Sequence, residues 1–386
     1  MIKQNDAVMV TRPLFPRLKD YEKNLEDIWD SGWLSNNGAK HQELESQIKE
    51  YIKAPNISLF NNGTIALLTA IQSLRLQGEV ITTPFSFPAT THVLAWNNIT
   101  PVFCDIHPDR LTIDPDKIER LITAKTTAIL GVHVYGVPCH VEEIQDIADR
   151  HGLRVIYDAA HAFTTQYKGN PIADYGDISM FSFHPTKLFH TGEGGALVFN
   201  DANLKQRIEF LKNFGIKNEE EVILPGINGK MNELQAAMGL EVLPLVAKEQ
   251  EARRKIRALY KENLEGVKGI NIVDVPSDAT NSEQYFCIRI NENEFGESRN
   301  AVYEQLKKHN IFSRKYFYPL ISQYPCYRAS PSASIENLPV ATQIANEVLC
   351  LPFYGKLNQE QISVICKCIN RKHAKYKEKH SVTTRD

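Results

Sequence analysis

The sequence predicts an α/β fold in which a mainly parallel sheet is sandwiched by helices. Two observations support this prediction. From about residue 40 to about residue 200, short apolar runs alternate with segments whose apolar residues recur every three or four positions, and glycine, proline or polar residues end the runs. Short continuous apolar runs are typical of strands buried on both faces, and such strands form parallel sheets covered by helices.

Seven short apolar runs are the predicted strands of this sheet. They cover residues 57–60, 80–83, 101–104, 127–134, 153–157, 178–183 and 196–199. Three helices are predicted from apolar residues that share a helical face, namely Leu44, Ile48 and Ile52, then Leu67, Ile71 and Leu74, then Val141, Ile144 and Ile147. In an open α/β sheet ligands bind beyond the carboxyl ends of the strands, so the residues that follow each run are the candidates for chemistry.

After about residue 245 the pattern changes, and we predict a large domain over residues 1–245 and a smaller α/β domain over residues 246–386. The smaller domain begins with a long charged helix, Val246 to Leu264. Its other predicted elements are strands at 270–275, 285–290 and near 311–316, a helix at 299–309, and two final helices with faces Ile344 and Val348, and Ile362, Ile365 and Ile369. The basic segment 371–380 is interpreted as a solvated terminus rather than an interaction arm.

Composition excludes several classes of protein. The 386 residues carry 44 Lys and Arg against 46 Asp and Glu, a net charge of −2, which argues against nucleic-acid binding. The seven cysteines include one C-x-C pair and no second pair at zinc spacing, so we expect reduced thiols and no metal site. No apolar run reaches the length of a signal peptide or a membrane span, so we expect a cytoplasmic protein without membrane contact.

A lysine in an unusual position is the first sign of chemistry. Lys187 follows the predicted strand 178–183 in a turn that also contains Pro185, and a glycine-rich segment, 191–195, comes next. Lysine is rarely buried unless it is paired or chemically used, and a partly desolvated lysine becomes a nucleophile that forms Schiff bases. A solvent-facing loop lysine is the alternative, and it would be preferred if Lys187 stood alone.

Three further segments accompany Lys187 at predicted strand ends. Asp158 ends the strand 153–157 beside two alanines, and a buried carboxylate there needs a cationic or hydrogen-bonding partner. The 62–64 segment, Asn-Gly-Thr, opens a helix whose free N–H groups favour a phosphate, although a plain N-cap explains it as well. Phe85 and Phe87 could stack on a flat ring or belong to the core.

One ligand accounts for all four features. It carries a phosphate, an aromatic ring nitrogen and an aldehyde that reacts with an amine. Pyridoxal 5′-phosphate (PLP) has this chemistry and is held in enzymes by a lysine Schiff base and an acidic partner of the ring nitrogen.

Four segments resemble motifs of the DegT/DnrJ/EryC1/StrS sugar aminotransferases, in the same order, within a resemblance that runs from about residue 12 to 370. The segments are 62–67, 158–161, 182–187 and 226–237. The resemblance implies the PLP-dependent transferase fold of type I, with a seven-stranded sheet in the large domain, and a homodimer with shared active sites.

The resemblance also assigns a role to each matching cofactor residue. Lys187 would hold PLP, Asp158 would bind the ring nitrogen, and His161 would lie near the ring hydroxyl, where the family more often has glutamine. The remaining cofactor-binding residues are Gly63, Thr64 and Ser182 at the phosphate, Phe87 against the ring, and Asn228 at the phosphate of the neighbouring subunit's cofactor, with Lys230 a further candidate for the same task.

The substrate-binding residues come from two other segments. Tyr316 and Tyr318 lie where the family approaches the nucleotide sugar. His184 and Glu193 flank the lysine turn and are the other substrate-binding candidates, although His184 could instead shape that turn and Glu193 could cap it.

Within the family, the 58–64 and 225–233 segments are most similar to the dTDP-4-amino-4,6-dideoxyglucose (viosamine) transaminases. This resemblance implies transfer of an amino group from L-glutamate to a dTDP-linked 4-keto-6-deoxyhexose for O-antigen and lipopolysaccharide synthesis. Open alternatives are a C3 transaminase, an enzyme for UDP-linked 4-keto sugars, and a non-catalytic regulatory member. A nucleotide-dependent dehydrogenase is disfavoured because no glycine fingerprint with a downstream acidic residue is present.

Overall fold

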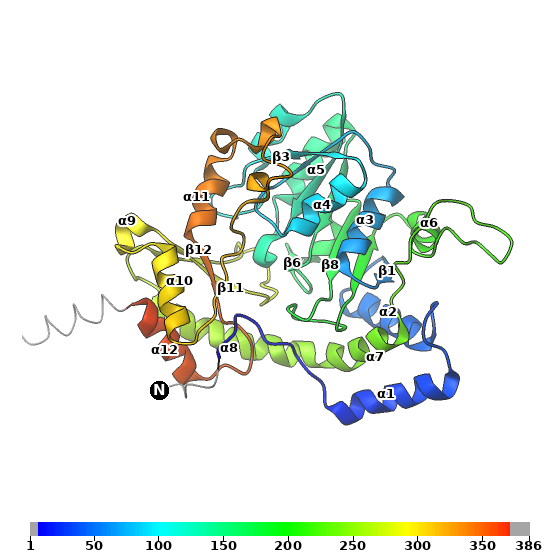
Figure 1. Cartoon of the computed structure of the whole chain (residues 1–386), viewed down its shortest axis with the longest axis horizontal. Coiled ribbons are helices and arrows are strands. Elements are labelled where there is room, and N and C mark those ends of the chain that lie inside the picture. The colour runs from blue at the N-terminus through cyan, green and yellow to red at the C-terminus, as the bar shows by residue number, and fades with distance from the viewer. Residues whose placement is uncertain (1–6, 371–386) are drawn as a thin grey trace, which may run out of the picture.

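The computed structural model describes residues 7–370 and has a twisted central sheet with helices on both sides (Figure 1). Within these residues the central sheet has seven strands. Their order is β1 (Asn56–Phe60), β9 (Gly195–Phe199), β8 (Ile178–Ser182), β5 (Arg154–Asp158), β4 (Thr126–Val132), β2 (Glu79–Thr82) and β3 (Thr100–Phe103). All neighbours are parallel except β9, which is antiparallel to β1 and β8. The predicted α/β fold is confirmed, and each predicted run matches a strand to within two residues at either end.

Helices bury both faces of this sheet. One face is covered by α3 (Gly63–Ser73), α4 (Pro88–Trp96) and α6 (Leu204–Leu211). The other face is covered by α2 (Ala39–Tyr51), α5 (Val141–His151) and α7 (Glu233–Val242). In β4, Ala128 and Leu130 pack against the first set and Ile129 against the second. Because successive strand residues point to opposite faces, burial of both faces requires the continuous apolar runs seen in the sequence.

The N-terminal helix lies outside this arrangement. Helix α1 (Leu18–Ser31) runs along α7, where Tyr21 donates a hydrogen bond to the Leu234 carbonyl and Asn24 donates one to Glu241. A two-stranded hairpin, β6 (Gln166–Tyr167) with β7 (Asn170–Pro171), follows β5. Short 3₁₀ helices occupy Pro115–Lys117, Glu119–Leu121, Val134–Gly136, Ile172–Asp174, Leu243–Leu245, Ile321–Gln323, Pro331–Ala333 and Ile335–Asn337.

The C-terminal part is built around a second sheet. Helix α8 (Val246–Leu264) has the predicted bounds, and β10 (Ile270–Val273), β11 (Phe286–Ile290) and β12 (Val348–Leu351) form an antiparallel sheet. The remaining helices are α9 (Glu292–Phe295), α10 (Arg299–Lys308), α11 (Pro339–Glu347) and α12 (Gln359–Ile369). Their shared core includes Tyr260, Phe286 and Ile365, and it also takes in Val8 from the N-terminal segment.

Two predicted elements of the C-terminal part are wrong. Residues 311–316 do not form a strand, because their backbone partners come from two different segments. Ile311 and Phe312 pair with Val8, whereas Arg314 pairs with Cys350. No continuous ladder forms along either partner. Val348, predicted on a helical face, instead begins β12, whose four residues are buried. The basic segment 371–380 lies outside the described residues.

A third group of buried side chains joins the two parts of the molecule. Phe85 and Tyr135 from the central-sheet part pack with Tyr285, Phe317 and Cys350 from the C-terminal part. This contact places β11 and the 311–320 segment opposite the carboxyl ends of the central strands. In residues 7–370, no helix combines the length and the apolar character that crossing a membrane requires.

Candidate active site

A cavity of about 630 Å³ opens at the carboxyl ends of β1, β2, β4, β5 and β8. Its opposite wall is formed by Tyr285, Arg314, Tyr316 and Phe317. Most of the predicted site residues line the cavity. They are Gly63, Thr64, Phe87, Asp158, His161, Ser182, His184, Lys187, Glu193 and Tyr316. Asn228, Lys230 and Tyr318 do not line it. The rule that ligands bind beyond strand ends therefore locates the cavity correctly.

Lys187 sits in a turn that the backbone fixes on both sides. The Phe183 N–H donates to the Gly194 carbonyl at 2.8 Å, and the Lys187 N–H donates to the His184 carbonyl at 2.8 Å. Among the described residues, no hydrogen-bond or ion-pair partner is recorded for the Lys187 ammonium. Burial lowers its pKa to about 8, and the negative charge of Asp158 opposes this shift. At pH 7 about a tenth of the amine is therefore neutral and able to act as a nucleophile, a far larger fraction than for a lysine of ordinary pKa.

Asp158 ends β5 and is 5% exposed. Thr90 Oγ1 donates to its Oδ2 at 2.7 Å, and the Ala160 N–H donates to its Oδ1 at 3.1 Å. Ser86 lies 2.7 Å from Thr90, so a chain of hydroxyls leads to the carboxylate. Burial raises the pKa of Asp158, while the hydrogen bonds from Thr90 and Ala160 and the charge of Lys187 act in the opposite direction. A cation bound in the cavity would stabilise the ionised form of the Asp158 carboxylate.

The sequence reasoning missed Thr90 and Ser86. Both are buried hydroxyls; Ser86 lies in the loop between β2 and α4, and Thr90 lies in the first turn of α4. The signal for Ser86 was its position shortly after β2, whereas Thr90 lies within α4 and meets Asp158 only through the packing of α4 against β5.

The start of α3 combines an N-cap with an open first turn. Asn62 Oδ1 accepts the Ile65 N–H at 2.8 Å, so Asn62 is the N-cap of α3. The sequence allowed either a plain N-cap or a phosphate site at this position. The N–H groups of Gly63 and Thr64 lie in the first turn of α3, where no intrahelical acceptor is available, and both residues line the cavity. Free N–H groups at a helix N-terminus favour an anion. A Cβ at Gly63 would lie 3.1 Å from Met180 Sδ and Ser182 Cβ. The absence of a side chain there lets Ser182 approach the helix start.

His161 forms a flat stack at the edge of the cavity. Its ring lies 5.9 Å from that of Phe317, at an interplanar angle of 3°, and 4.9 Å from that of Tyr285, edge to face. The Tyr135 N–H donates to Nδ1 at 3.2 Å, so Nε2 carries the proton of the neutral ring. Burial holds the pKa of His161 well below its usual value, and the charge of Lys187 adds to this effect. His161 is thus a neutral hydrogen-bond donor.

The two candidate aromatic residues after β2 have different environments. Phe85 is fully buried and packs edge to face against Tyr135 and Phe317. Phe87 is 58% exposed and lines the cavity. Only Phe87 of this pair can lie against a bound ring.

The opposite wall is aromatic and carries one cation. Tyr316 lines the cavity with Phe317, while Tyr318 is turned outward beneath the Arg299 guanidinium, which lies 5.0 Å from its ring centre. Arg314 lines the cavity, and its backbone exchanges two hydrogen bonds with Cys350. Among the described residues the Arg314 guanidinium has no recorded partner. The sequence reasoning missed this residue because nothing in its neighbourhood marks it locally.

Two predicted cofactor-binding residues lie away from the cavity. Asn228 is exposed, and its carbonyl accepts a hydrogen bond from Asn61 at 3.3 Å. Lys230 donates to Asn213 at 2.7 Å and lies over the Phe214 ring. Asn228 and Lys230 could contact a cofactor only in the active site of a second chain.

The residues present fit PLP. A buried carboxylate that needs a cation, a free amine of lowered pKa, a glycine at an open helix start and a neutral histidine donor line the same cavity. In residues 7–370, no group of three or more His, Cys, Asp or Glu side chains is arranged to hold a metal ion.

The fold and the site define a PLP-dependent aminotransferase of fold type I. The chain belongs to the DegT/DnrJ/EryC1/StrS aminotransferase family, whose model matches residues 18–370. PLP is the cofactor of this family, so the predicted family, fold, enzyme class and cofactor are confirmed.

Several relatives are similar over nearly the whole chain. A dTDP-4-amino-4,6-dideoxy-D-glucose transaminase of Escherichia coli is 50% identical over 366 residues, covering 94% of this chain and 98% of the relative. A transaminase of the same name from Shigella dysenteriae is 43% identical over 363 residues, covering 94% and 98%. The crystal structure of DesI in the presence of its TDP-sugar product is 33% identical, has a TM-score of 0.90, and covers 97% of this chain and 96% of that one.

Proposed function

We propose that this enzyme transfers an amino group from L-glutamate to C4 of dTDP-4-dehydro-6-deoxy-D-glucose, giving dTDP-4-amino-4,6-dideoxy-D-glucose and 2-oxoglutarate. The observation that carries the chemistry is the presence of Lys187 and Asp158 in one cavity at the sheet edge. The choice of sugar and nucleotide is supported by the names of the relatives at 50% and 43% identity.

Each residue of the cofactor wall has a task in this reaction. When bound, PLP supplies an electron sink for the negative charge that develops on the reacting carbon. Lys187 Nζ would hold the cofactor, and once displaced by the incoming amine it would take the proton from the substrate carbon and return it. Asp158 would keep the proton on the ring nitrogen, and His161 Nε2–H would donate to the ring hydroxyl.

The phosphate and the ring face would be held by the remaining residues. The N–H groups of Gly63 and Thr64 and the Ser182 hydroxyl would bind the phosphate, and Phe87 would cover the ring. His184 and Glu193 border the same cavity and would contact the substrate, with Tyr316 on the opposite wall. Tyr318, which faces outward in this structure, would reach a nucleotide only at the mouth of the site.

The proposal includes a homodimer with shared active sites. Four large apolar residues are exposed on the loop between α6 and α7, namely Phe214, Ile216, Val222 and Ile223. Figure 1 shows this loop projecting from the body of the molecule. Asn228 lies at the end of the same loop and would reach the cofactor phosphate of a second copy. Such exposed apolar groups are typical of subunit interfaces.

The cellular setting is also part of the proposal. The enzyme would act in the cytoplasm, in the synthesis of an O-antigen or another surface polysaccharide. We also propose the division into a PLP-binding domain over residues 1–245 and a smaller domain over residues 246–386. The start of α8 at Val246 and the separate core behind it support this boundary.

A product assay tests the proposed substrate. The purified enzyme, loaded with PLP, is given glutamate and in turn dTDP- and UDP-linked 4-keto and 3-keto sugars, and the amino sugar is identified. We expect the dTDP-linked 4-keto-6-deoxyglucose to be converted with the highest kcat/KM and the amine to appear at C4. Preferred conversion of a UDP-linked sugar, or an amine at C3, would contradict the proposal.

A further inference from the structure

We propose that Gln284 is a positioning residue for Lys187, which the C-terminal part of the molecule supplies to the active site. This inference rests on the proposed role of Lys187 as the residue that holds the cofactor. Gln284 is 2% exposed and lies just before β11, far in sequence from the lysine turn. Its side chain bonds to the backbone on both sides of Lys187.

Both functional groups of the Gln284 amide are used at this turn. Gln284 Oε1 accepts the Leu188 N–H at 2.7 Å, and Gln284 Nε2 donates to the Thr186 carbonyl at 2.9 Å. One planar amide thus bridges the residues before and after Lys187. This contact fixes the direction in which the Lys187 side chain leaves the backbone. A side chain with one rigid group and two bonds is well suited to hold a catalytic amine in a set direction.

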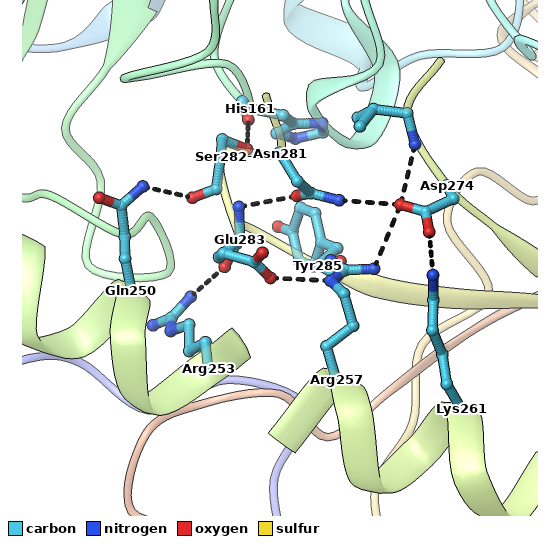
Figure 2. Close-up of polar contacts among 11 residues, drawn as sticks. His161, Gln250, Arg253, Arg257, Lys261, Asp274, Asn281, Ser282, Glu283 and Tyr285 are labelled. Atoms are coloured by element: carbon cyan, nitrogen blue, oxygen red, sulfur yellow. Dashed lines mark hydrogen bonds and ion pairs between the residues drawn. The ribbon is translucent and has the colours of Figure 1, made fainter. Parts of the chain in front are cut away.

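We term residues 282–284 the strap. Two of them, Ser282 and Glu283, are held by side chains of α8 (Figure 2). Arg253 donates to the Glu283 carbonyl at 3.0 Å, and Arg257 Nε donates to the Glu283 carboxylate at 2.8 Å. Gln250 donates to the Ser282 carbonyl at 3.2 Å. Glu283 has a φ of +59°, a conformation that side chains other than glycine adopt only when the surroundings impose it. The strap is therefore an anchored element and not a loose loop.

The strap also contacts the other cofactor-binding side of the cavity. Ser282 Oγ donates to the His161 carbonyl at 2.7 Å, a contact shown at the top of Figure 2. Two adjacent segments of the site, the lysine turn and the histidine, are therefore tied to one support. Burial disfavours the charged form of the Lys187 nitrogen. A change in the direction of the side chain would therefore give that nitrogen, free or bound to the cofactor, better solvation when it carries its proton.

Gln284→Met tests this role, because methionine has a similar length and cannot form either bond. The loaded enzyme is titrated with acid and base while the visible absorption of the Lys187-bound cofactor is recorded, and kcat and KM are measured. We expect the titration midpoint to rise by about one pH unit. We also expect kcat to fall about tenfold or more, with little change in KM for glutamate.

Gln250→Met is the matched control. Gln250 is 7% exposed and bonds to the same strap and to Thr164, but it does not touch the lysine turn. We expect it to lower the thermal midpoint as Gln284→Met does and to leave the spectral midpoint unchanged. If the two variants have the same spectral midpoint, Gln284 contributes only packing and the proposal is wrong.

Two further arms keep the test decisive. If Gln284→Met does not fold, Gln284→Leu is used, which is also uncharged and forms neither bond; an unshifted midpoint there overturns the proposal. The titration needs no sugar, so a wrong assignment of the substrate does not affect it. A wild-type enzyme without the visible band would instead contradict the proposed function itself.

Discussion

The two walls of the cavity differ in composition and in how they are built. The wall formed by the central sheet carries Asp158 and Lys187, whose neighbouring backbone bonds to adjacent strands and turns. The wall formed by the C-terminal part is mainly aromatic, with Tyr285 and Tyr316, and it also carries Arg314. Much of this wall lies outside any strand or helix. The first wall carries the charged groups Lys187 and Asp158, whereas the second is mainly aromatic and carries one cation, Arg314, whose guanidinium has no side-chain partner among residues 7–370.

This difference separates the expected effects of substitutions. A transaminase acts in two half-reactions, the first with the amino donor and the second with the keto sugar. Changes on the sheet wall should slow both half-reactions, because both use the same amine and carboxylate. Changes on the C-terminal wall should act mainly on sugar binding.

The largest effect is expected for Lys187→Ala. We expect turnover to fall by about 10⁴-fold or more, because the group that holds the cofactor and the group that moves the proton are removed together. Lys125→Ala, an exposed lysine remote from the cavity, is the control and should keep full turnover. Steady-state rates of amino-sugar formation measure both. Turnover of the Lys187 variant within tenfold of wild type would exclude its assigned role.

Asp158→Asn should have the second largest effect. We expect kcat to fall by about 10² to 10³-fold, as when one preorganised electrostatic group is removed from an active site. The amide keeps an acceptor for Thr90 and a similar volume, so the protein should remain folded. Single-turnover rates with glutamate alone and with keto sugar alone should fall together. An effect confined to one half-reaction would contradict the claim that the sheet wall serves both half-reactions.

Cofactor loading should depend on pH through Lys187. Only the neutral amine reacts with the aldehyde, and with a pKa of about 8 its neutral fraction rises steeply from pH 6 to pH 8 and levels off above pH 8. The initial loading rate of the cofactor-free protein should therefore rise about 50-fold between pH 6 and pH 8. An N-acetyl-lysine reaction run in parallel corrects for ionisation of PLP. A rate that rises as steeply between pH 8 and pH 10 would indicate an amine with an ordinary pKa.

Arg314→Gln tests the C-terminal wall. Arg314 lines the cavity, and we propose that its guanidinium binds the phosphates of the substrate. We expect KM for the dTDP sugar to rise about tenfold, because that charged hydrogen bond would be lost. The half-reaction with glutamate and the spectral titration should not change. Arg314→Lys keeps the charge and should recover part of the affinity. If the glutamate half-reaction slows instead, Arg314 binds a donor carboxylate and the two walls share both substrates.

The smallest effect is expected for His161→Gln. Glutamine keeps one donor and one acceptor, so it can still accept the Tyr135 N–H and donate into the cavity. We expect kcat/KM within about threefold of wild type by steady-state kinetics. His161→Leu, which leaves the Tyr135 N–H without its acceptor, should be clearly slower and less stable. Equal activity of the leucine variant would remove the hydrogen-bonding role.

The sheet wall could be predicted from sequence because its residues follow directly on strands with strong local patterns. Asp158 and Lys187 are recognisable by what precedes them along the chain. Thr90, Arg314 and Gln284 could not be found in this way, because each meets its partner only after elements distant in sequence have packed together. The wrong strand at 311–316 has the same origin, since its bonding partners come from two separate segments.

The most direct measurement is to locate the cofactor on the chain. The PLP-loaded enzyme is reduced with borohydride, digested, and the labelled peptide is sequenced by mass spectrometry. We expect loss of the visible band and a stable pyridoxyl group on Lys187, with one label per chain. A label on another lysine, or no label while activity persists, would contradict the assignment of Lys187 as the residue that holds the cofactor.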